Sequence, residues 1–169
     1  MPGLADISQA AVLAALGNIN LTRGVLAINA ASAATIKSTN AYTYAIGGVF
    51  KALSALSAQA FSTGHAAQAP KSVNGTAYGS TAYYLVVVNA AGTVSTVAGN
   101  IHYDSLVSTG GDNPAAVLPD APAGTAVLGA LKVVVDSTHT FTPGTTALDA
   151  AGVTVTYFDL ACIPASVAP

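Results

Sequence analysis

Alternation between apolar and polar residues predicts strands over most of the chain. From about residue 24, short apolar or alternating runs are separated by turn residues. Residues 41–46 place aromatic side chains at period two and lead into Gly47-Gly48, a pair that favours a tight hairpin. Val49-Phe50 then begins the return strand. Residues 51–61 fit a helix and an extended return strand equally well.

The strongest strand signals lie in the middle and the last third of the chain. Residues 83–88 are apolar and β-branched, and a turn at 89–92 leads into an alternating run at 93–97. Two more strands are expected at 126–135 and 153–158. The stretches rich in Gly, Pro, Ser and Asp predict connections, and these are residues 62–80, 104–124 and 142–152.

Short strands with frequent turns are typical of one fold class. They predict a mainly β protein, with an antiparallel β-sandwich or barrel-like domain preceded by a short N-terminal α-helix or arm. We assign residues 35–169 to the β-rich domain. Residues 1–34 form the helical or extended arm.

The arm carries the chain's clearest helix signal. Asp6 and Gln9 have the spacing of a capping box, and Gly17 is a natural stop. A helix of about ten residues is too short to be stable alone, so its apolar face must dock. Two alternatives remain open, docking on its own domain and docking on a partner or symmetry mate. The candidate partner-binding residues on that face are Ile7, Val12, Leu13 and Leu16.

The composition of the chain indicates how much of the protein surface is exposed to solvent. Charged residues make up only 7% of the chain, against about 25% in an average soluble protein. Hydrophobic residues make up 52%, and the mean hydropathy is +0.57. This composition favours a surface that is largely buried against other subunits.

The charge and hydropathy of the chain also argue against several classes of protein. Five basic residues and a net charge of −2 argue against nucleic-acid binding. No window of about 18–20 mainly apolar residues could span a membrane, and the N-terminus lacks the basic start of a secretory signal. We expect neither nucleic acid nor membrane as a partner.

Candidate chemistry is weak. His65, His102 and His139 lack zinc-site spacing, and a single cysteine, Cys162, cannot complete one. The run from His102 to Ser105 holds triad residue types, but neighbours in a strand point to opposite faces. Asp104, Asp112 and Asp120 could gather around calcium, although they match no calcium-loop spacing. We predict no catalytic, metal or cofactor site.

Four tyrosines offer another alternative. Tyr42, Tyr44, Tyr83 and Tyr84 could form a sugar-binding platform. Aromatic residues at period two in strands are more often cross-strand packing partners, and the chain has no tryptophan. We therefore expect these tyrosines to pack within the sheets.

Three phrases of the sequence resemble tailed-bacteriophage virion proteins. They are STNAYTYAIGGV at 38–49, LPDAPAG at 118–124 with the following Val127-Leu128-Gly129, and FTPGTTALDAAGVT at 141–154. The resemblance spans about residues 35–162. It implies no catalytic residues, and residues 1–34 take no part in it.

The resemblance implies a role in the virion. The chain resembles decoration, cement or head-fibre proteins. We therefore expect a protein at the capsid surface that binds the major capsid protein and stabilises the shell. A homo-oligomer is expected, with a trimer favoured. The alternative is a head-fibre or tail-associated module that binds a host surface.

Overall fold

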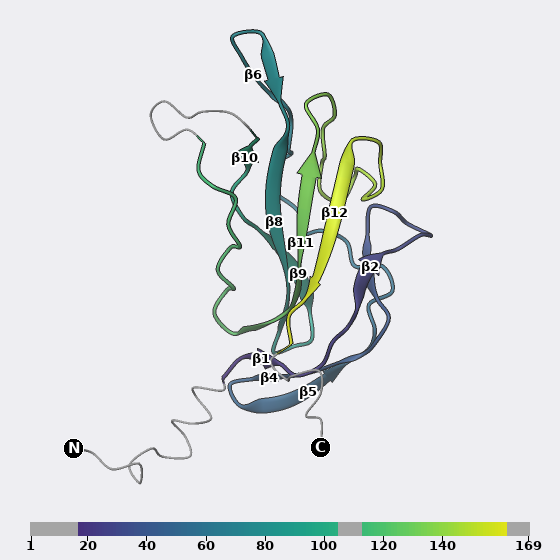
Figure 1. Cartoon of the computed structure of the whole chain (residues 1–169). Coiled ribbons are helices and arrows are strands. Elements are labelled where there is room, and N and C mark those ends of the chain that lie inside the picture. The colour runs from purple at the N-terminus through teal and green to yellow at the C-terminus, as the bar shows by residue number, and fades with distance from the viewer. Residues whose placement is uncertain (1–16, 105–112, 162–169) are drawn as a thin grey trace, which may run out of the picture.

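All regular structure in the computed structural model is β-strand (Figure 1). The structure describes residues 17–104 and 113–161, and those ranges contain no helix. Every strand pairing is antiparallel, and no sheet formed by the described residues closes into a barrel. The prediction of a mainly β, antiparallel fold is confirmed. The predicted N-terminal helix lies in residues 1–16, outside the described residues.

A five-stranded sheet forms the centre of the molecule. β8 (Ser80–Asn89) pairs along its length with β11 (Thr125–Val135), and β12 (Val153–Asp159) lies on the far side of β11. On its other side β8 pairs with β9 (Val94–Ala98) and with β10 (His102–Tyr103). The predicted hairpin around residues 89–92 and the two later strands are confirmed.

A bulge in β11 determines which of its residues face the core. The register against β8 shifts between Val127 and Gly129. Strand residues alternate between faces, so Leu128 and Leu131 would otherwise lie on opposite sides. With the bulge, both are fully buried in the main core.

A three-stranded sheet lies across the lower end of the central sheet in Figure 1. It consists of β1 (Ile19–Asn20), β4 (Tyr42–Ile46) and β5 (Val49–Leu53), with β4 in the middle. The buried Asn20 side chain ties the two sheets together, because its amide donates to Leu128 O at 3.3 Å and to Leu160 O at 3.1 Å. The ambiguous segment 51–61 continues β5 to Leu53 and contains no helix.

Two further hairpins complete the fold. β2 (Leu26–Ile28) pairs with β3 (Ile36–Ser38), so residues 17–34 contribute two strands, β1 and β2, to the sheets. β6 (Lys71–Val73) pairs with β7 (Thr76–Tyr78). The expectation that all of 62–80 is loop is therefore wrong.

The core lies between the inner face of the central sheet and segments that return to it from far along the chain. Phe61 and Phe141 pack edge-on against Tyr84, with ring centroids 5.3 and 6.3 Å away. Gln68 is fully buried beside them, and its amide donates to Tyr84 Oη at 3.0 Å. Ser80 Oγ donates to Gln68 Oε1 at 3.4 Å, so both ends of the amide have partners.

Candidate functional site

The three histidines lie in three separate local settings. His65 Nε2 is 2.8 Å from Thr96 Oγ1, and burial lowers the pKa of His65. His102 Nδ1 is 3.1 Å from Pro114 O. His139 pairs with Asp136. Within residues 17–104 and 113–161, no group of three or more His, Cys, Asp or Glu side chains could hold a metal ion.

The neighbours His102 and Asp104 do not form a catalytic pair. Asp104 Oδ1 accepts a hydrogen bond from Thr81 Oγ1 at 3.1 Å, whereas His102 contacts Pro114 O. Asp120 is exposed in the connection that follows. Ser105, Asp112 and Cys162 lie outside the described residues.

The side chains of Asp136 and His139 are in contact and close an exposed turn after β11. His139 Nδ1 lies 2.9 Å from the Asp136 carboxylate, which also accepts from the backbone N–H groups of Thr138 and His139. The Thr138 hydrogen bond is the first cause of the low pKa of Asp136, about 2, and the His139 contact is the second. The sequence analysis did not identify Asp136 as a candidate residue. Its carboxylate oxygens accept hydrogen bonds from residues of the same turn, which is a structural role.

Asp136 and Asp104 also line a polar hollow of about 550 Å³ at one end of the central sheet. Both carboxylates already accept hydrogen bonds from their own neighbours. The two carboxylates therefore take part in the local fold.

The tyrosines divide between the two faces of the sheets. Tyr42, Tyr44 and Tyr84 are buried in the main core, as expected for cross-strand packing. Burial raises the pKa of Tyr42 to about 12. Tyr83 differs, because it points to the opposite face of β8.

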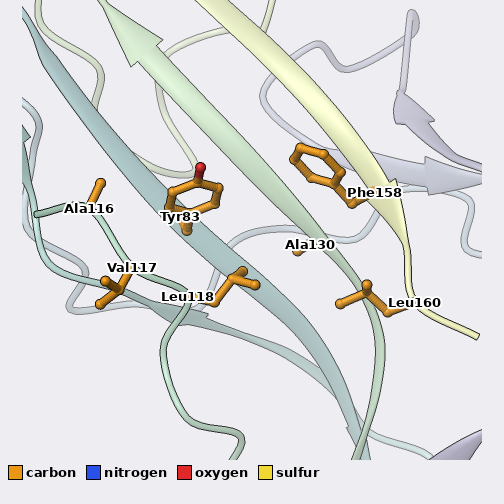
Figure 2. A pocket seen from close by; sticks show the side chains of 7 residues that line it. All are labelled: Tyr83, Ala116, Val117, Leu118, Ala130, Phe158 and Leu160. Atoms are coloured by element: carbon orange, nitrogen blue, oxygen red, sulfur yellow. The ribbon is translucent and has the colours of Figure 1, made fainter.

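That opposite face, here called the outer face of the central sheet, holds an apolar hollow of about 420 Å³ (Figure 2). Strand residues form one side of it, and a loop segment that runs beside β8 forms the other (Figure 2). None of the described residues that line it is charged. Its lining consists of Tyr83, Ala116, Val117, Leu118, Ala130, Phe158 and Leu160.

The strand register builds the floor of the hollow. Ala130 pairs with Leu85 on one side and with Phe158 on the other, so a small side chain lies between two large ones. Leu85 and Ala130 are buried in a second, smaller apolar cluster with Val87. The hollow is thus a gap in the cover of this face.

Two asparagine side chains hold the loop wall in place through hydrogen bonds to backbone groups. Asn113 Oδ1 accepts from Tyr103 N at 2.7 Å, and Asn113 Nδ2 donates to Tyr103 O at 2.9 Å. The Asn100 amide donates to the carbonyls of Pro114 and Ala115. Gly99 lacks the Cβ that would collide with Val117 O, so the loop can pass close to the strand.

The hollow is open to solvent although its lining is apolar. Val117, Leu118, Phe158 and Leu160 expose between 38% and 55% of their surface. Large exposed apolar side chains that gather in one place mark interaction surfaces. Sequence reasoning missed this site, although Phe158 interrupts the polar positions Thr154 and Thr156 on the same face of β12.

A second exposed apolar feature is the tip of the β4–β5 hairpin. Val49 and Phe50 are 59% and 69% exposed, the highest values among the large apolar side chains of the described residues. Phe50 pairs with Ala45, which pairs in turn with Ile19. The tip therefore continues an apolar row across the three-stranded sheet.

The candidate partner-binding residues predicted from the sequence, Ile7, Val12, Leu13 and Leu16, lie outside the described residues. Comparisons of the chain with protein-family models, with curated proteins and with solved structures find no match. The part of the chain that the structure describes also holds no helix long and apolar enough to cross a membrane.

Proposed function

We propose that this chain is a structural subunit of a tailed-bacteriophage virion that binds the outer capsid surface as a decoration or cement protein. The observation that carries the proposal is the apolar hollow on the outer face of the central sheet, which residues 17–104 and 113–161 leave open. A single domain gains nothing by exposing four large apolar side chains around one gap, unless another surface covers them.

Composition and sequence resemblance support the same proposal. A chain with 7% charged residues depends little on surface ion pairs, so its contacts lose little strength at high salt. Layered antiparallel sheets around one core give a sandwich-like domain of the kind we expect for such subunits. The phrases at 38–49, 118–124 and 141–154 give the resemblance to virion proteins.

The settings of the candidate chemical groups favour a non-catalytic role. His65, His102 and His139 each contact a different neighbour, and Asp104 and Asp136 are engaged in local hydrogen bonds. An active site instead brings a base, a nucleophile and an orienting group within hydrogen-bond reach of each other. The proposed activity is therefore binding.

The test is the copy number of this chain relative to the major capsid protein, measured by quantitative mass spectrometry on purified particles. A ratio near one, or a simple fraction such as one third, is the expected result. A handful of copies per particle would favour the fibre or tail alternative. Absence from the particles would overturn the proposal.

The arm is tested separately by truncation. Removing residues 1–16 leaves β1 and its pairing with β4 intact, because β1 begins at Ile19. We expect the truncated chain to fold and to bind capsids more weakly. Unchanged capsid binding would show that Ile7, Val12, Leu13 and Leu16 do not contact the shell.

A further inference from the structure

Exposed large apolar side chains are concentrated in two places on this protein. Of the seven such residues in the described ranges, four line the hollow and two, Val49 and Phe50, form the hairpin tip. The seventh, Val25, belongs neither to the lining of the hollow nor to the hairpin. The two clusters have opposite shapes, because one is a hollow and the other is a projecting turn.

The tip is held in one conformation. Gly47 and Gly48 have φ values of 58° and 77°, the positive pair that a type I′ hairpin turn requires. Gly47 N donates to Asn18 Oδ1 at 2.9 Å, and Gly48 N donates to Gly17 O at 3.2 Å. A preorganised projection loses little conformational entropy when it binds.

The hollow matches the tip in size and polarity. Its volume of about 420 Å³ lies within the range of roughly 300–1,000 Å³ typical of small-molecule pockets in proteins, so it has room for one aromatic side chain. Val49 and Phe50 are consecutive residues of β5 and face opposite sides of the hairpin, so Phe50 is the side chain that can enter the hollow. Among the described residues, the lining contains no charge that an inserted phenyl ring would leave unpaired.

The surroundings of the two features also complement each other in charge. Lys51 follows Phe50 on β5, whereas the exposed Asp120 follows two residues after Leu118. Among the described residues, neither Lys51 nor Asp120 forms a salt bridge. A tip docked in the hollow brings opposite charges to the rim of the contact, where they favour the correct partner.

We propose that the β4–β5 hairpin tip of one copy of this chain inserts its Phe50 side chain into the apolar hollow of a second copy. A specific interface buries about 800 Å² on each partner, and one aromatic side chain supplies about 150–250 Å². The contact therefore includes the flanks of the hairpin as well as Phe50. Each subunit of a closed assembly gives one tip and receives one.

This contact does not depend on the capsid proposal. It is made between copies of the chain alone, so it is measured on purified protein without particles. A virion protein that is monomeric in solution would overturn this contact and leave the proposed function standing. A self-associating protein that is absent from virions would do the reverse.

The first experiment measures the mass of the full chain by sedimentation velocity over a range of concentrations. We expect the natural chain to associate, and Phe50→Glu or Leu118→Glu to weaken association by roughly tenfold or more, because each buries an unpaired charge at the contact. Val25→Glu is the matched control, since it charges an exposed apolar position outside both surfaces and leaves association unchanged. Circular dichroism checks that each variant is folded.

The second experiment asks which surfaces touch. In a Cys162→Ser background, one chain carries Phe50→Cys and another carries Leu118→Cys. We expect a disulfide between unlike chains when the two are mixed and oxidised, and little between like chains.

Two results would overturn the proposal. One is a natural chain that stays monomeric at every concentration. The other is cross-linking that joins only like chains, which would mean that tips meet tips or hollows meet hollows.

Discussion

The two faces of β8 are alternating residues of one strand, yet they are covered differently. Tyr84, Val86 and Val88 point into the main core, where loops from residues 61–68 and 141–148 pack over them. Leu85 and Val87 point the other way into a small cluster, and Tyr83 beside them borders the hollow. The described part of the chain covers the inner face fully, whereas it leaves the apolar outer face partly uncovered.

This difference indicates what each face does. A covered face contributes to the free energy of unfolding, and an uncovered one contributes to association. Substitutions on the inner face should therefore change the stability of the monomer. Substitutions at the hollow should change self-association and leave monomer stability nearly unchanged.

The largest effect is expected for Leu131→Ala on the inner face. Leu131 is fully buried and pairs with Tyr84 and Tyr157 across the ladder. We expect the free energy of unfolding to fall by about 2–5 kcal/mol, measured by urea denaturation. Leu118→Ala, at the half-exposed hollow, is the control and should cost less than about 1 kcal/mol. Equal losses at both positions would remove the distinction between the faces.

A smaller effect is expected for Gln68→Leu. This change leaves the buried Tyr84 hydroxyl and Ser80 hydroxyl without the amide, at a cost of about 1–3 kcal/mol. Adding Tyr84→Phe removes one of the orphaned groups, so the double variant should lose less than the sum of the two single variants. Strict additivity in urea unfolding would mean that the amide and the hydroxyl do not interact.

On the outer face, Phe158→Thr should barely affect the monomer. Threonine continues the pattern of Thr154 and Thr156 on the exposed side of β12. We expect the unfolding free energy at high dilution to change by less than about 1 kcal/mol, while self-association weakens by roughly fivefold or more. A large loss of monomer stability with unchanged association would place Phe158 in the fold rather than at a contact.

The smallest effect is expected at Asp136, which belongs to neither apolar face. Its pKa falls from an ordinary 3.8 to about 2, so the folded chain favours the carboxylate. The stability that this adds is complete above pH 3.8 and is lost as the pH falls through about 2. An NMR titration of the carboxyl carbon should give that midpoint. A midpoint near 3.8 would mean that the turn does not hold the carboxylate.

Much of the fold could be predicted from local pattern. The runs that became β8, β11 and β12 are β-branched and bounded by turn residues, so their strands follow from composition. The same reasoning could have found β6 and β7, because Asn74-Gly75 is a strong hairpin signal between two short runs. That signal was hidden inside a stretch otherwise rich in loop residues.

The candidate site could not be predicted in the same way. Leu118 and Phe158 are 40 positions apart, and they meet only because β12 pairs with β11 while the loop runs beside β8. The bulge between Val127 and Gly129 also reverses the expected alternation, which hides Ala130 as the floor of the hollow. Only the three-dimensional register reveals which apolar residues lack a cover.

The most direct test of this account is amide hydrogen exchange on the full chain, compared at low and high protein concentration. Association should slow exchange in peptides that cover residues 47–53 and 113–119, and leave the exposed turn at 136–139 unchanged. If both segments exchange at the same rate at every concentration, the hollow and the tip are not contacts between copies of this chain.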